Sequence, residues 1–120
     1  MGGLFSLYAG LHRPDVFGKV AAFSPSVWWG RRDILRRVRR PAGRLAAEPD
    51  FRLWLDTGTA ESQRPAQVVS GVRALRDAFL QRGWRLGHDL GYLEAEGAGH
   101  DERAWGARME PMLRFLYPAR

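Results

Sequence analysis

Residues 96–101 are Glu-Gly-Ala-Gly-His-Asp, a short polar segment with two glycines and one histidine. Gly97 and Gly99 allow backbone conformations that other residues avoid, and Asp101 is a good N-cap for a following helix. The segment therefore predicts the end of a strand, a turn that carries His100, and the start of a helix. Loops of this kind hold the functional sites of α/β folds, and histidine is a frequent acid–base residue. For this loop alone, a surface histidine beside a helix cap is the alternative interpretation.

The segments on either side of this loop predict alternating strands and helices. Three short apolar runs are typical of buried parallel strands, near residues 19–24, 51–56 and 91–96. Four segments carry apolar residues at helical spacing, over residues 1–13, 30–40, 65–82 and 101–117. A loop is expected between residues 41 and 49, around Pro41, Gly43 and Pro49. This order predicts the α/β class with a parallel sheet.

Two of the predicted helices carry features that packing must explain. The first contains Gly2, Gly3 and Gly10, and an interior glycine costs a helix roughly 1 kcal/mol. We therefore expect this helix to pack very close to a neighbouring segment. The last helix is expected to turn its apolar side chains inward: Trp105, Met109, Met112, Leu113 and Leu116.

Length and composition limit the classes of protein that fit. A chain of 120 residues with 45% hydrophobic residues is one domain, or part of one, with a packed core. The absence of cysteine excludes disulfides, thiolate metal sites and a cysteine nucleophile, and we expect no metal and no other cofactor. No apolar run approaches the roughly 20 residues that span a bilayer. No basic-then-apolar signal segment opens the chain, so we expect a cytoplasmic protein without membrane association.

The net charge of +6 is carried almost wholly by arginine, since Lys19 is the only lysine. A basic balance can indicate nucleic acid or another anionic partner. Residues 31–40 hold six arginines, but no stacking aromatic residue is interleaved among them. We therefore interpret this segment as a solvated basic helix face that could meet an anionic substrate, and we expect no binding of nucleic acid.

The loops after the three predicted strands should meet at one rim of a parallel sheet. An α/β-hydrolase triad runs in the chain order Ser, Asp or Glu, His. Glu61, in the second loop, and Asp56, at the end of the second strand, both precede His100 and are both candidates for the acid that orients its imidazole. A turn cap for Asp56 and a first-turn helix carboxylate for Glu61 are the alternatives.

The nucleophile of such a triad lies on an elbow of the form G-x-S-x-G, followed directly by a helix. Met1-Gly2 fits the last two positions of that motif, so the serine is expected immediately before Met1. Ser26 is on the presumed rim, but no elbow surrounds it.

At this point the chain resembles the Putative esterase family, of the esterase D and enterochelin-esterase type. It is also similar to feruloyl esterases and mycolyltransferases, which are α/β-hydrolases too. The resemblance rests on four blocks in the family's order: Met1–Leu4, Phe17–Trp29, Gly58–Glu61, and Gly97–Asp101 with Trp105. It implies a partial α/β-hydrolase fold, with residues 1–120 forming the C-terminal half of one domain. It also implies a serine carboxylic ester hydrolase with a small-molecule ester substrate.

The resemblance implies a role for each site residue. Glu61 is the triad acid, with Asp56 as the alternative, and His100 is the general base and acid. The backbone amide of Met1 donates to the oxyanion, and Trp28 and Trp29 border the substrate pocket or pack in the core beside it. Which ester is cleaved stays open among siderophore lactones, feruloyl sugars, S-acyl thiols and simple acyl esters.

Without its nucleophile the chain is expected to be inactive by itself. The alternative function is a non-catalytic remnant that binds a protein partner. In either case we expect an unpaired sheet edge, at the strand over residues 19–24, to favour self-association.

Overall fold

A computed structural model describes residues 1–40 and 50–120 of the chain, and the loop predicted around Pro41, Gly43 and Pro49 lies outside these residues. Within them, three strands form one parallel sheet in the order β1-β2-β3. The strands are β1 (Lys19–Ala22), β2 (Arg52–Gly58) and β3 (Leu90–Ala95). The predicted parallel sheet and its three strands are therefore confirmed, with small shifts at the ends.

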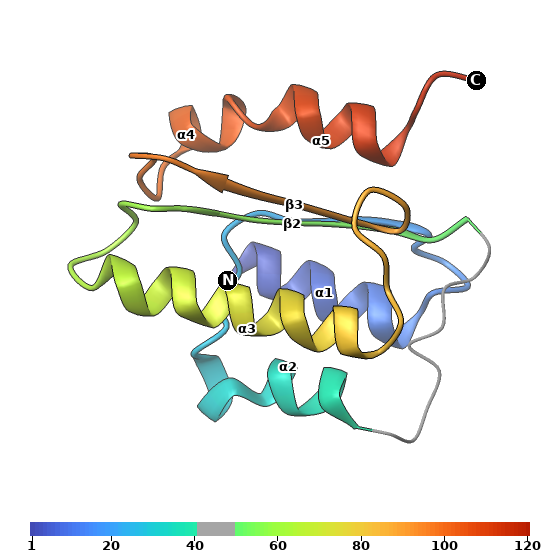
Figure 1. Ribbon diagram of the computed structural model, residues 1–120, viewed down its shortest axis with the longest axis horizontal. Coiled ribbons are helices and arrows are strands. Elements are labelled where there is room, and N and C mark those ends of the chain that lie inside the picture. The colour runs from blue at the N-terminus through green and yellow to red at the C-terminus, as the bar shows by residue number, and fades with distance from the viewer. Residues whose placement is uncertain (41–49) are drawn as a thin grey trace.

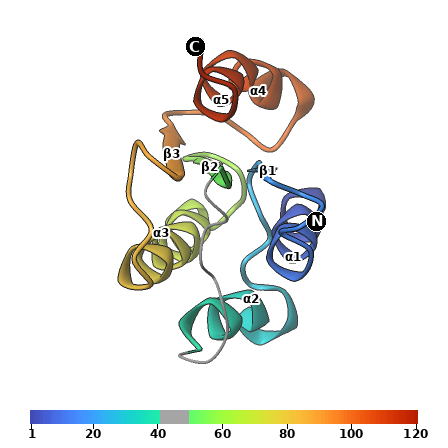
Figure 2. The same cartoon turned by 90° about the vertical axis from the view of Figure 1, so that its right-hand side faces the viewer.

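The helices cover both faces of this sheet (Figure 1). The helices α1 (Gly2–His12) and α3 (Pro65–Gln81) lie on one face, and α4 (Glu102–Gly106) and α5 (Met109–Leu116) lie on the other. Figure 2 shows the strands end-on between these two helix layers, with α2 (Trp29–Arg39) beyond α1 and α3. The result is a layered α/β arrangement whose strands end on the same side of the molecule.

The main core lies between the sheet and the helices α1, α2 and α3. Its apolar side chains come from the inner faces of the strands and helices. Among the buried ones are Leu7, Ile34, Leu55, Leu75 and Phe79. A smaller apolar cluster on the other face joins Trp54 to Met112 and Leu116 of α5. Burial of apolar surface, at about 25 cal/mol per Å², is the main force that holds the layers together.

The first strand ends earlier than the sequence predicts. It stops at Ala22, because Ser24 adopts a left-handed backbone conformation with φ of 44°. The Ser24 amide donates to the Asp56 carboxylate at 3.0 Å instead of joining the sheet. The chain therefore turns away from the sheet at Ser24, and this turn opens the rim described below.

The prediction of a single helix over residues 101–117 is wrong. The structure has two helices, separated at Ala107 and Arg108. Met112 is buried as expected, but Met109 and Leu113 are 41% and 45% exposed. Arg108 lies at this break and points inward, because its guanidinium binds the buried Asp56 carboxylate.

The close packing predicted for the first helix is confirmed. A Cβ atom on Gly3 would lie 2.4 Å from the backbone oxygen of Phe23, and one on Gly10 would lie 2.5 Å from Cγ2 of Val20. Both distances are shorter than carbon atoms tolerate, so the glycines allow α1 to pack directly on β1 and the segment that follows it. Gly2 has no atom within 4 Å of such a Cβ position.

We expect Gly3→Ala to lower the free energy of unfolding by about 1 to 3 kcal/mol, although alanine favours helices, because the methyl group overlaps a backbone oxygen. Gly2→Ala is the matched control and should leave stability unchanged or slightly raised. Urea unfolding of the two variants, followed by circular dichroism, measures the difference. Equal stability of both variants would show that α1 does not pack as described.

An ion-pair cluster joins α3 to β3 on the outside of the fold. Arg73 donates two hydrogen bonds to Glu94, at 2.5 and 2.8 Å, and Tyr92 donates to the same carboxylate at 2.6 Å. The guanidinium of Arg76 lies over the Tyr92 ring at 4.7 Å. The bonds from Arg73, and next from Tyr92, lower the pKa of Glu94 from its ordinary value of 4.5 to about 2.

Because the pKa of Glu94 is lower in the folded chain, its contribution to stability is present above pH 4.5 and is lost as the pH falls towards 2. We expect Glu94→Gln to destabilise the chain at pH 6 by up to about 1 kcal/mol, since the Arg73 partner is half exposed. The stability gap between wild type and variant should shrink below pH 4.5. Urea unfolding across pH 2.5 to 6 tests this, and a gap independent of pH would contradict it.

Candidate active site

The loops that follow the three strands meet at one end of the sheet, as the sequence predicts (Figure 1). A cavity of about 1000 Å³ opens there. Its walls come from residues 24–28 after β1, residues 61–64 after β2, the first turns of α3, and His100 after β3. The cavity is therefore assembled from segments that are far apart in the sequence.

The loops after β2 and β3 are joined by hydrogen bonds. The amide of Ala60 donates to the oxygen of Ala98 at 3.0 Å, and the amide of Gly97 donates to Oγ1 of Thr59 at 2.8 Å. A Cβ atom on Gly58 would lie only 2.2 Å from the Ala98 oxygen. A glycine at position 58 thus allows the two loops to approach closely enough for their side chains to meet.

Glu61 and His100 meet across these two loops. Oε2 of Glu61 lies 3.4 Å from Nδ1 of His100, and the Glu61 side chain is only 3% exposed, whereas that of His100 is 46% exposed. The Trp105 ring packs edge-on against the imidazole, with 4.9 Å between ring centroids. Asp101 caps α4 as predicted, since its Oδ1 accepts from the Ala104 amide at 2.8 Å. A histidine held in this way through Nδ1 can exchange protons through Nε2.

Asp56, the alternative acid, lies elsewhere. It is fully buried and accepts hydrogen bonds from the Ser24 amide at 3.0 Å, Trp54 Nε1 at 2.8 Å and Arg108 Nε at 3.0 Å. Neither His100 nor the turn over residues 57–59 is among its hydrogen-bond partners in the described chain. Asp56 therefore fixes the interior behind the rim, and the turn cap suggested for it is replaced by this role.

Arg108 is the residue that the sequence interpretation missed. Its side chain is 3% exposed, and its Nη2 lies 2.9 Å from Ser24 Oγ and 3.8 Å from Glu61 Oε1. An arginine in a basic chain is normally a surface residue. The one available signal was Gly106, because a glycine inside a predicted helix can mark its end.

The start of the chain also lies at this rim. The amino group of Met1 donates to Ser26 Oγ at 3.3 Å, and Ser26 lines the cavity. Trp28 lines it as well and is 68% exposed, whereas Trp29 begins α2 and is not among the lining residues. Of the two predicted pocket tryptophans, the structure brings only Trp28 to the cavity, and neither tryptophan is buried in the core.

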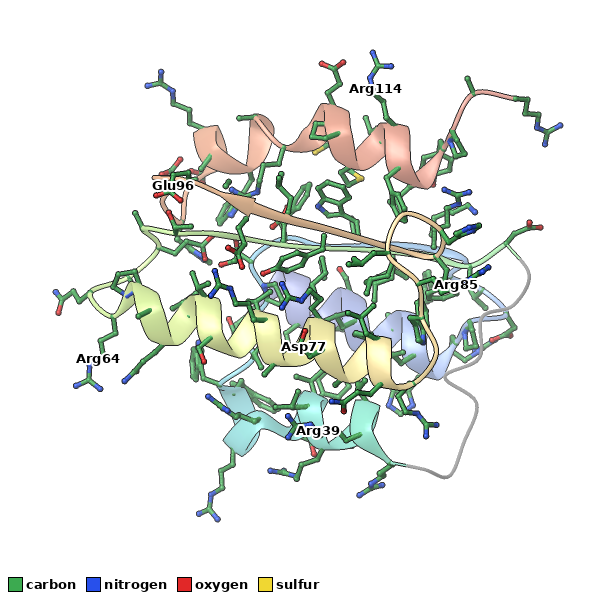
Figure 3. All side chains as sticks on the ribbon, viewed as in Figure 1. Arg39, Arg64, Asp77, Arg85, Glu96 and Arg114 are labelled. Atoms are coloured by element: carbon green, nitrogen blue, oxygen red, sulfur yellow. The ribbon has the colours of Figure 1, made fainter. Side chains whose placement is uncertain are left out.

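Two arginines add positive charge to the cavity wall. Arg32 comes from the basic segment noted in the sequence, and Arg64 comes from the loop before α3. Arg32 ends a left-handed stretch, since Gly30, Arg31 and Arg32 have φ values of 59°, 56° and 61°. Figure 3 shows Arg64 at the same end of the molecule as Glu96, where the strands finish. The cavity thus carries cations at its wall and the Glu61–His100 pair at its edge.

Metal sites and membrane-spanning helices were also sought among the described residues. Residues 1–40 and 50–120 contain no group of three His, Cys, Asp or Glu side chains that could hold a metal ion. In the same ranges, every helix is too short or too polar to cross a bilayer.

Comparisons with known proteins identify the family of the chain. The family described as Putative esterase matches residues 1–116. The iron(III) enterobactin esterases of Escherichia coli strains CFT073 and K12 are 33% and 30% identical over 98% of the chain, which spans about 28% of their length.

Among solved structures, the enterobactin esterase of Shigella flexneri in the presence of 2,3-dihydroxy-N-benzoyl-glycine is 30% identical, with a TM-score of 0.73 over 98% of this chain and 30% of that one. The Bacillus cereus BES protein, 24% identical with a TM-score of 0.71, shares the fold. The chain therefore belongs to the Putative esterase family, and its three parallel strands with alternating helices are part of an α/β-hydrolase fold.

Proposed function

We propose that this chain supplies the acid and the histidine of a Ser-Glu-His triad in a serine carboxylic ester hydrolase. The observation that carries the proposal is the contact of 3.4 Å between the buried Glu61 carboxylate and the half-exposed His100 at the edge of the cavity. Membership of an esterase family supports it. Residues 1–120 would form the C-terminal half of one α/β-hydrolase domain.

In this reaction His100 removes the proton from the serine hydroxyl, and the serine oxygen attacks the ester carbonyl. Glu61 holds Nδ1–H of the imidazole and stabilises the imidazolium that forms. The imidazolium then protonates the departing alkoxide, which leaves an acyl-serine. Water, deprotonated by His100, then attacks the acyl-serine. The imidazolium returns this proton to the serine oxygen as the acyl bond breaks, which releases the acid product and the free serine.

The serine would be the residue immediately before Met1, and the Met1 amide would donate to the oxyanion. Two observations support this placement. Met1-Gly2 fits the end of a nucleophile elbow, and the Met1 nitrogen lies 3.3 Å from Ser26, a residue of the cavity wall. An oxyanion donor of this kind contributes about 3 kcal/mol to the transition state.

The ester we propose is that of a catechol siderophore. The similar E. coli proteins are named iron(III) enterobactin esterases, and one similar Shigella structure was solved in the presence of 2,3-dihydroxy-N-benzoyl-serine. That molecule combines a catechol ring with a carboxylate. Arg32, Arg64 and Trp28 line the cavity, and they offer two cations and an aromatic ring for such groups.

A protein-binding remnant without activity is the second candidate. One observation favours it: in the described chain β1 pairs with β2 alone, so its other edge is open. An open edge is a template for association with another strand.

The two candidates differ in activity. We expect the 120-residue chain to hydrolyse p-nitrophenyl acetate no faster than its His100→Ala variant, because the nucleophile that we propose would precede Met1. The chain extended upstream through an in-frame Gly-x-Ser should hydrolyse both this ester and enterobactin, and His100→Ala should abolish that activity. A stop codon directly upstream, or an inactive extended protein that is folded, would favour the remnant. Activity of the short chain itself would point to another nucleophile, such as Ser26.

The two carboxylates can be separated in the extended enzyme. We expect Glu61→Gln to lower kcat by about 10⁴-fold with little change in KM, because the imidazole loses its orienting acid. Asp56→Asn should act mainly on stability, lowering the free energy of unfolding by about 3 kcal/mol, because it leaves the Arg108 charge buried without its partner. Steady-state kinetics and urea unfolding on both variants measure this. The acid assignment is wrong if a folded Asp56→Asn enzyme is inactive while Glu61→Gln is nearly unchanged.

A further inference from the structure

The two oxygens of Glu61 have different surroundings. Oε1 accepts a hydrogen bond from the Gly58 amide at 2.8 Å and one from Ser24 Oγ, and it lies 3.8 Å from Nη2 of Arg108. Oε2 faces His100 at 3.4 Å. The contacts to Oε1 therefore fix the carboxylate and leave Oε2 for the imidazole.

Arg108 is itself clamped in one position. Its Nε and Nη2 bind the two oxygens of Asp56, at 3.0 and 3.2 Å, and its Nη1 donates to the Ala104 oxygen at 3.3 Å. The same Nη2 donates to Ser24 Oγ at 2.9 Å. A guanidinium that is 3% exposed and bound on three sides has little freedom to move.

The hydrogen bonds fix the direction of the Ser24 hydroxyl. A guanidinium can only donate, so Ser24 Oγ accepts from Arg108. The single hydroxyl hydrogen of Ser24 is then free to point at Oε1 of Glu61, which is the other hydrogen-bond partner of Ser24 Oγ. The left-handed backbone of Ser24, with φ of 44°, brings the hydroxyl to this place and is held by the bond from its amide to Asp56.

Arg108 also offsets part of the negative charge in the cluster that it forms with Asp56 and Glu61. Asp56 and Glu61 are two buried carboxylates, and Arg108 is the cation that contacts both. The cluster carries one net negative charge, which matches the single positive charge of a protonated His100. Without Arg108, two buried carboxylates would share one interior without a cation between them.

We propose that Arg108, acting through Ser24, is a positioning residue that holds the Glu61 carboxylate in the orientation in which it supports His100. The inference rests on the proposed function, since it concerns the same pair. Arg108 does not reach the reacting atoms, and its effect passes entirely through Glu61. Its removal should therefore lower kcat and leave KM nearly unchanged.

The test uses the extended enzyme with its serine. We expect Arg108→Gln and Ser24→Gly each to lower kcat about 10- to 100-fold, by analogy with the residues that orient the ligands of metal sites. Glycine suits the left-handed position of Ser24, so this variant removes the hydroxyl without backbone strain. The matched control is Arg114→Gln on α5, whose side chain is exposed and points away from the sheet in Figure 3, and its kcat should equal that of the wild type.

A double-mutant cycle separates positioning from a general structural effect. In a Glu61→Gln background, Arg108→Gln and Ser24→Gly should each change kcat less than twofold, because the group on which they act is gone. Equal losses in both backgrounds would overturn the inference. If Arg108→Gln does not fold, the Ser24→Gly cycle decides alone, since it keeps the Asp56–Arg108 ion pair. A normal kcat for Glu61→Gln would show that Glu61 is not the triad acid, and it would overturn both the proposed function of Glu61 and this inference. A normal kcat for Arg108→Gln and Ser24→Gly, together with a low kcat for Glu61→Gln, would overturn this inference and leave Glu61 as the acid.

Discussion

The buried ion pair between Asp56 and Arg108 is the interaction on which this end of the molecule depends. It joins the central strand to the junction of α4 and α5, and through the Ser24 amide it also holds the segment that leaves β1. Breaking a buried pair by removing one partner typically costs 3–5 kcal/mol, because the remaining charge is left without compensation. The pair thus ties together three segments, of which the one at Ser24 lines the cavity.

The parallel topology explains why this ion pair is needed. Strands that run in the same direction bring all their following loops to one rim, but they do not fix how those loops sit against each other. Gly58 permits the contact between the second and third loops, since any side chain there would overlap the Ala98 oxygen. The Asp56–Arg108 pair fixes the first loop against the second. Together they define where Glu61 and His100 lie.

The order of the elements could be predicted from the sequence because it depends on local features. Apolar spacing, glycines and prolines located all three strands and the helices up to Gln81. The histidine loop, the cap by Asp101 and the contact of Glu61 with His100 followed from chain order and family resemblance. The loop and the cap are local features, whereas the contact of Glu61 with His100 spans 39 residues and was predicted from the family resemblance.

Arg108 and Ser24 escaped prediction because their positions depend on distant partners. Arg108 is inward because of Asp56, which is 52 residues away in the chain, and the last helix breaks as a consequence. Ser24 lies outside the strand because its amide donates to the same carboxylate, which is 32 residues away in the chain. Trp29 was predicted at the pocket with Trp28, yet only Trp28 lines the cavity, and Trp29 begins α2.

The charges on either side of His100 complete the physical account of the site. Behind the imidazole, Asp56, Glu61 and Arg108 leave one net negative charge in a buried region, where water screens it little. In front, Arg32 and Arg64 place positive charge on the cavity wall. The imidazole of His100 thus faces the Glu61 carboxylate on its inner side, and an anionic group in the cavity would face the arginines of the wall. In the proposed reaction charge separates in this same direction, with the imidazolium towards Glu61 and the negative charge on the substrate side, so the fixed charges of the fold favour the transition state over the resting pair.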